Sequence, residues 1–270
     1  MGKVKIKRKS TLIDMTAMSD VTVLLLTFFM LTSTFLQKEP TIVYTPSSVS
    51  EEKVPMNNLV TILVSSEDKS GKSEDPTKSE GKIFISFTGD ADSTLSSENI
   101  RSMMLDEAIA VYNDQHKNNP ISLTAAQKMT FRQTNMFGTP FAHLADLMEM
   151  TPGDRDKEQG ELQNPYTGFP IDGNKNRDGR LNDFQIWLKA IYNVAQRINN
   201  EQAEGLTPEE RQNLNNLYTA LMRKGQGIAV KADKDTPFTT VQEVFDNLQT
   251  MKLNKFSLMT ALKSEDEPTN

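Results

Sequence analysis

The pattern of apolar and polar positions divides the chain into an apolar N-terminal segment, a polar connection and a mixed C-terminal region. The longest apolar run extends from Val21 to Leu36, and together with the turn before it predicts a helix over residues 15–36. At about 1.5 Å per residue, such a helix crosses a hydrocarbon core of roughly 30 Å. The sequence contains no second run of this kind, so we predict a single transmembrane helix.

The region after this helix changes from linker composition to strand composition. Residues 37–57 are rich in proline, serine and glutamate, which predicts an extended, solvated linker. Residues 58–64 and 82–87 are rich in β-branched residues and phenylalanine and predict a hairpin with a long polar loop. Two strands with an amphipathic helix between them are predicted near the C-terminus: 227–231, 241–251 and 255–262.

Between these strand regions, residues 93–225 mostly follow a helical period and predict a long helical insertion. Two apolar stripes mark its first and second helices: Leu95, Ile100, Met103, Met104, Ala108 and Val111, then Leu181, Phe184, Leu188, Ile191, Ala195 and Ile198 with Trp187 beside them. Thr207 before Pro208 predicts the N-cap of a third helix that continues to about Met222. Residues 151–180 contain many prolines and glycines and predict a loop.

The predicted fold is therefore a single N-terminal transmembrane helix plus an α+β periplasmic domain with a long helical insertion. The predicted parts, in chain order, are a basic tail, the membrane helix, the linker, the α+β domain and a frayed end: 1–14, 15–36, 37–57, 58–264 and 265–270.

Charge predicts the orientation of the helix. The first ten residues contain five lysines and arginines and no acid, so the positive-inside bias places the N-terminus in the cytoplasm. Residues 37–270 then lie on the other side of the membrane. A cleaved secretory signal is the alternative, because it also combines a basic start with an apolar run. The length of the run, the acids Asp14 and Asp20 before it, and the lack of a small-residue cleavage site favour a retained anchor.

Composition excludes several classes of function. The net charge is −6, and without the five basic residues of the N-terminal tail the exported part is clearly acidic, which argues against a nucleic-acid partner. The chain has no cysteine, so it forms no disulfide and no cysteine-ligated metal site. Its two histidines, His116 and His143, belong to no catalytic pattern, and we predict neither an enzyme nor a bound cofactor.

Asn174–Gln185 partly matches a calcium loop, although asparagine and glutamine replace its first and last acids. A loop that caps the following helix is the alternative.

The main candidate site lies on the apolar helix. A carboxylate in a membrane is costly, and such residues usually face a partner or a water-filled cavity. Asp20, Thr27 and Thr34 are seven residues apart, and seven residues turn an ideal helix through roughly 700°, so the three lie on one face. We predict that this polar line carries protons against another helix. The alternative is that Asp20 is solvated at the interface and the threonines bond back to their own helix.

Residues 13–21, Ile-Asp-Met-Thr-Ala-Met-Ser-Asp-Val, followed by the apolar run Leu24–Met30, resemble the signature of the ExbD/TolR family of biopolymer-transport proteins. In that pattern the proton-carrying aspartate falls on Asp20. The segment Val43–Pro46 and the segment Ile228–Asp233, with the helix after it, are similar to further family elements. Ala17 stands where the family usually has proline, and the insertion over 93–225 makes the domain longer than in compact members.

The resemblance implies a subunit that transduces the proton-motive force in an inner-membrane complex of the ExbB–ExbD–TonB or TolQ–TolR–TolA type. It implies a channel partner like ExbB or TolQ, a TonB- or TolA-like protein, contact with membrane lipid, and a homodimer. A strand such as Phe256–Leu262 could pair with a partner by strand addition. The alternative is a membrane-anchored periplasmic binding or scaffold protein that translocates no protons.

Overall fold

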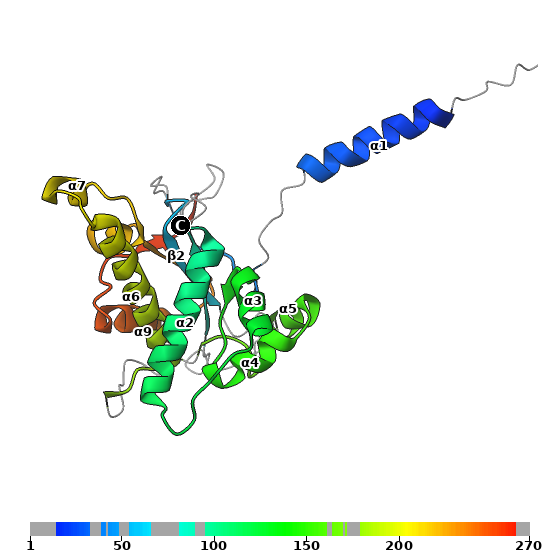
Figure 1. Ribbon diagram of the computed structural model, residues 1–270. Coiled ribbons are helices and arrows are strands. Elements are labelled where there is room, and N and C mark those ends of the chain that lie inside the picture. The colour runs from blue at the N-terminus through cyan, green and yellow to red at the C-terminus, as the bar shows by residue number, and fades with distance from the viewer. Residues whose placement is uncertain are drawn as a thin grey trace, which may run out of the picture. The chain divides into compact units, whose positions relative to one another are not determined.

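The computed structural model describes residues 15–32, 39–41, 43–48, 54–65, 81–89, 95–160, 164–169, 171 and 179–262. The chain forms two compact units, residues 1–38 and residues 39–270. The described part of the first unit is one helix, α1 (Met15–Thr32), which is labelled in Figure 1. Residues 33–36 of the predicted span lie outside the described residues, as does the tail 265–270.

The second unit is built on a mixed sheet of five strands. Its strands are β2 (Leu59–Ser65), β3 (Lys82–Thr88), β4 (Met136–Phe137), β5 (Ile228–Ala232) and β6 (Ser257–Met259), in the order β4-β3-β2-β5-β6. β2 and β3 are antiparallel, which confirms the predicted hairpin, and β5 and β6 continue the sheet in parallel. Two short strands, β1 (Ser47–Ser48) and β7 (Ala261–Leu262), pair in parallel with each other.

The helices of the second unit are α2 (Ser97–Gln115), α3 (Ala125–Gln133), α4 (Phe141–Glu149), α5 (Pro152–Gly160), α6 (Asp183–Ala203), α7 (Pro208–Gln212), α8 (Leu217–Thr219) and α9 (Phe238–Thr250), with a π-helix over Ala220–Lys224. Figure 1 shows α2 and α6 side by side, and these two helices contact each other along their length. The apolar stripes predicted for both helices lie against the core, and α6 is buried on a wider face than its stripe indicates.

Alternation along the strands gives the sheet two different faces. Val60, Ile62 and Val64 of β2 point to the main core, where the register pairs Ile62 with Ile85 of β3. The main core also receives buried residues from α2, α3, α4, α6, α8 and α9. Leu63 of β2 points to the opposite face. The second unit is therefore a mixed α/β domain whose helices contribute their buried apolar residues to one face of the sheet.

Aromatic side chains form the centre of the main core. Trp187 of α6 stacks on Phe131 of α3 and on Phe141 of α4, with ring centroids 5.4 and 5.5 Å apart. Phe137 of β4 lies 4.6 Å from the same indole. Pairs of this kind contribute about 0.5–1.5 kcal/mol each beyond the burial of their surface. The cluster fixes α3, α4 and α6 against the sheet.

Three predicted elements differ from the structure. The predicted loop over 151–180 contains a helix, α5, at its start. The predicted helix from Thr207 to Met222 is divided into α7, α8 and the π-helix, although Thr207 is its N-cap as predicted. The predicted last strand is divided at residue 260 into β6, which joins the main sheet, and β7, which joins β1. Residues 261–262 are thus already paired within the chain, and Ser257–Met259 forms the edge of the sheet.

The predicted linker over 37–57 also differs, because its described part is docked on the domain. Thr41 and Val43 are more than nine-tenths buried, and Ser47–Ser48 form β1. We call residues 39–48, apart from the undescribed residue 42, the strap.

Candidate functional site

Asp20 and Thr27 lie on the same continuous helix, α1, and both are exposed. The hydroxyl of Thr27 donates to the backbone oxygens of Val23 and Leu24, each at 2.9 Å. This is the back-bonding that the alternative interpretation expects of threonine in an apolar helix, and it leaves the hydroxyl oxygen able to accept a hydrogen bond. Thr34, the third residue of the predicted polar line, lies outside the described residues.

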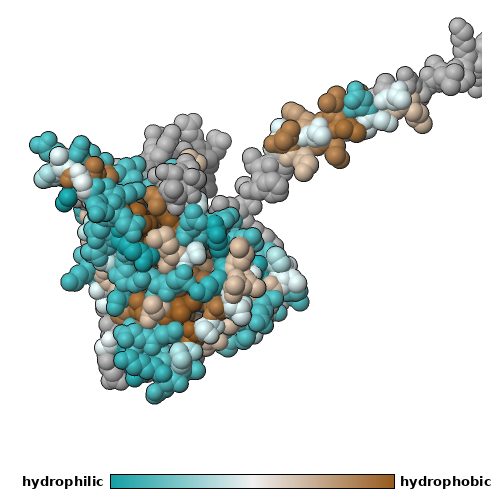
Figure 2. Space-filling view, viewed as in Figure 1, coloured by the Kyte–Doolittle hydropathy of each residue, from teal (hydrophilic) through white to brown (hydrophobic). Residues whose placement is uncertain are grey.

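The other side chains of α1 are mainly apolar and exposed. Several of them have more than half of their surface exposed: Val21, Val23, Leu24, Leu25, Leu26, Phe28, Phe29, Met30 and Leu31. Figure 2 shows this apolar surface along the visible side of α1. In the described part of the chain, no helix meets both the length and the hydropathy of a membrane span.

The strap crosses the face of the sheet opposite the main core. Val43 is 8% exposed and forms a small apolar cluster with Leu63 of β2, Phe84 of β3 and Met136 of β4. Leu63 and Phe84 are direct neighbours in the register of the hairpin. The cluster therefore seats Val43 over the centre of the β3–β2 pair, with Met136 added from the edge strand.

Polar contacts hold the strap on both sides of Val43. The backbone N–H of Tyr44 donates to the Oδ2 of Asp233 at 3.3 Å, and the N–H of Lys234 donates to the carbonyl of Tyr44 at 2.7 Å. The Nζ of Lys231 lies 2.7 and 2.8 Å from the carboxylate oxygens of Glu39. Asp233 is 5% exposed, so its carboxylate is a buried acceptor directed at the strap.

These contacts bring together two segments that the sequence analysis treated separately. Val43–Pro46 and Ile228–Asp233 are both part of the resemblance noted above, and they lie far apart in the sequence. In the fold, the first segment is bound by the end of β5 and the turn after it. No local pattern in the sequence indicates this contact.

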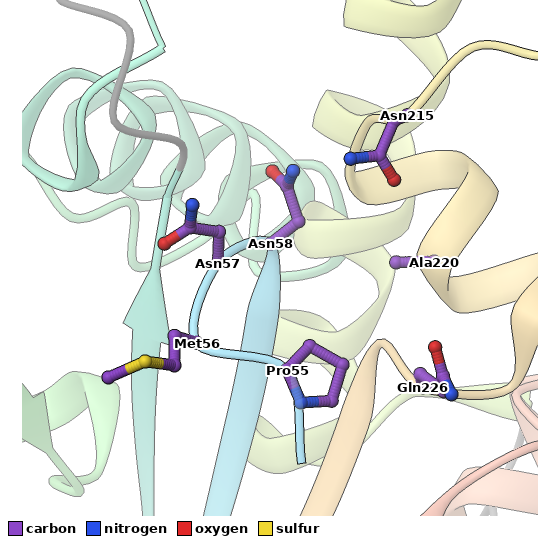
Figure 3. A pocket seen from close by; sticks show the side chains of 7 residues that line it. All are labelled: Pro55, Met56, Asn57, Asn58, Asn215, Ala220 and Gln226. Carbon is purple, nitrogen blue, oxygen red and sulfur yellow. The ribbon is translucent and has the colours of Figure 1, made fainter. Parts of the chain in front are cut away.

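A pocket of about 300 Å³ opens where the chain enters β2. Its lining residues are Pro55, Met56, Asn57, Asn58, Asn215, Ala220 and Gln226. Figure 3 shows the side chains of Asn58, Asn215 and Ala220 around a common space, with Pro55 and Gln226 at its lower side. The sequence analysis did not identify these residues, which come from the entry to β2 and from the segment around α8 and the π-helix.

The remaining candidates have structural roles where they are described. Asn182 and Gln185 form a capping box at the start of α6, so the capping interpretation holds for this end of the predicted calcium loop. Residues 172–178 of that loop lie outside the described residues. His116 stacks on Tyr112, and His143 packs edge-on against Tyr166. Among the described residues, no three histidine, aspartate or glutamate side chains cluster as metal ligands would.

The second unit, a mixed α/β domain that follows a helix carrying one carboxylate among apolar residues, is consistent with the periplasmic domain of a transport protein. Residues 7–136 match the family described as biopolymer transport protein ExbD/TolR. The match covers 130 of the 270 residues, from before α1 to β4, and supports the resemblance noted above to an ExbD/TolR-family biopolymer transport protein. No curated protein and no solved structure matches the chain.

Proteins of this family have a general role in energy transduction for biopolymer transport, and they are transport-associated proteins rather than enzymes. Its members are typically anchored in the inner membrane and generally work with ExbB/TolQ and TonB/TolA-like partners. The match ends at residue 136, so Asp233 and the turn that binds the strap lie beyond it.

Proposed function

We propose that this protein transduces the proton-motive force in an inner-membrane complex of the ExbB–ExbD–TonB or TolQ–TolR–TolA type. A helix over residues 15–36 spans the membrane, with the N-terminus in the cytoplasm and the second unit in the periplasm. Asp20 takes up and releases protons as they cross the membrane. The observation that carries the proposal is the position of Asp20 in an apolar helix inside the region matched to the family.

Physical reasons support a proton-carrying role for Asp20. A helix with apolar side chains all round is stable in lipid or in a protein core, and α1 exposes such side chains on most positions. A carboxylate there costs about 2.5–3.5 kcal/mol near the middle of a membrane, which favours a functional partner for it. Thr27, two turns further along, supplies a hydroxyl oxygen on the same face.

Asp20 requires helices from another protein. One helix cannot enclose a water-filled path, because its lipid-facing backbone must satisfy its own hydrogen bonds. We therefore propose that an ExbB/TolQ-like channel surrounds α1, that two copies of this chain act together, and that the domain engages a TonB/TolA-like protein. Only six residues, 33–38, connect α1 to the strap. Movement of the helix therefore reaches the strap through a short segment.

The test is proton flux through the full chain reconstituted with its channel partner in liposomes. We expect Asp20→Asn, which cannot ionise, to reduce flux at least tenfold and Asp20→Glu to retain part of it. Asp14→Asn makes the same chemical change six residues earlier and should leave the flux unchanged. Full flux in Asp20→Asn would overturn the proposal. That result would favour an anchored binding or scaffold protein, in which the pocket beside β2 would be the binding site.

A further inference from the structure

We propose that the pocket at the entry to β2 binds a small neutral saccharide. The proposal concerns the second unit alone and does not depend on proton transfer by Asp20. It begins from the side chains that surround the pocket. Four of the seven carry carboxamides: Asn57, Asn58, Asn215 and Gln226. Each carboxamide offers two N–H donors and one carbonyl acceptor.

Asn58 offers the pocket a carboxamide that is available to a hydrogen-bonding ligand. Its residue is 5% exposed, and its carboxamide forms no hydrogen bond with any other part of the chain that the structure describes. Its polar atoms are not among the buried unpaired atoms of the described residues, so they reach the water of the pocket and can bond to a ligand in place of that water. Figure 3 shows this carboxamide on the side of the pocket where Asn215 lies, pointing away from Pro55 and Ala220. Its backbone is also unusual, with φ at 54°, a conformation that asparagine tolerates better than most residues.

The charge and size of the pocket restrict the class of ligand. The seven residues that line the pocket are uncharged, and a neutral ligand needs no ionic partner among them. A volume of about 300 Å³ is at the lower end of ligand pockets and suits one sugar ring or two. Hydroxyl groups both donate and accept, which matches the carboxamides, and Pro55, Met56 and Ala220 offer apolar contact to the C–H faces of a ring.

The position of the pocket in the sheet argues against an extended peptide. A peptide that binds by strand addition needs a strand with a free edge. β2 is paired on both sides, with β3 and with β5, and the N–H of Val60 already donates to the carbonyl of Gly227. The groups that remain to bind a ligand here are side chains, and a compact polyhydroxy ligand uses them best.

The test follows the methyl group of Met56, which is 87% exposed at the rim of the pocket. The full chain, labelled with ¹³C in its methionine methyl groups, is placed in lipid nanodiscs, because detergents with sugar headgroups would compete. Glucose, galactose and N-acetylglucosamine are titrated in turn, and the Met56 signal is identified with Met56→Leu. We expect a saturable shift for at least one sugar, with a dissociation constant on the order of 1–10 mM for so small a ligand.

Two pocket variants and one control complete the experiment. Asn58→Gly removes the carboxamide while accommodating the positive φ, and Gln226→Ala removes a second one from a partly buried position. Each should weaken binding by about tenfold, the effect of one lost hydrogen bond. Asn118→Ala removes an exposed carboxamide from the turn after α2 and should leave binding unchanged. The proposal is overturned if no sugar gives a saturable shift, if tetra-alanine binds and the sugars do not, or if both pocket variants bind as the control does.

Discussion

Replacing Val43 by alanine tests whether the strap is held by its small apolar cluster. The valine is 8% exposed and packs with Leu63, Phe84 and Met136. The change removes two methyl groups from this cluster, at about 0.8 kcal/mol each. We therefore expect the free energy of strap docking to fall by about 1.6 kcal/mol, which raises the undocked fraction roughly 15-fold.

Hydrogen exchange of the full chain, read by mass spectrometry, measures this fraction. The N–H groups of Tyr44 and Lys234 report on docking, because each is bonded across the contact between the strap and the turn after β5. Exchange in peptides that cover these two residues should accelerate by about the same 15-fold factor when docking opens locally. The N–H of Val60, inside the sheet, should exchange as it does in the unchanged protein.

Tyr44→Ala is the matched control. The tyrosine side chain is 63% exposed, and the contacts that hold this residue are made by its backbone, so its truncation should change strap exchange little. If Val43→Ala leaves exchange in the strap unchanged, the cluster does not hold the strap. If exchange at Val60 accelerates equally, the strap and the sheet open as one unit and the reasoning from a separate docking step is wrong.

Two further predictions concern local stability. In Gly138→Ala the new methyl would overlap the carbonyl oxygen of Ile83 and lie 2.7 Å from a ring carbon of Phe84, so urea unfolding should show a loss of about 1–3 kcal/mol; an unchanged midpoint would contradict this. Hydrogen bonds from the Thr207 backbone and hydroxyl hold the pKa of Glu210 below its ordinary value. A lowered pKa adds stability that is present above the unfolded pKa and is lost as the pH falls through the folded pKa. Thr207→Ala keeps the backbone N–H and removes only the hydroxyl, so NMR titration should show the pKa of Glu210 returning part of the way toward its ordinary value. An unchanged pKa would refute the role of the hydroxyl.

The central strands and long helices could be predicted because their signals are local. The run of β-branched residues in β2 is buried on both faces, which explains why it shows no polar alternation. The stripe of α6 repeats with the helical period because one side of that helix faces the core. Helix α5 was missed because its sequence is charged and begins with proline and glycine, and it buries only Gln159. The available signal was Thr151 three residues before Asp154, whose side chains bond to each other at the start of the helix.

The strap and the pocket could not be predicted for a different reason. Both depend on contacts between segments separated by more than 150 residues, and composition near residue 43 indicates only a linker. The burial of Thr41 and Val43 follows a strand-like period of two, but two positions are too few to separate it from chance. Asp20 was found from sequence because a single acid in an apolar helix is a local anomaly.

The two faces of the sheet explain how a long insertion and a docked strap can share one domain. The buried apolar residues of α2, α3, α4, α6 and α8 all join the main core, so those helices leave the strap face to Val43 and its neighbours. Met136 is the exception: β4 lies within the insertion, pairs with β3, and places this side chain in the strap cluster. If movement of α1 reaches the domain through the strap, Met136 is the point at which the insertion would meet that movement.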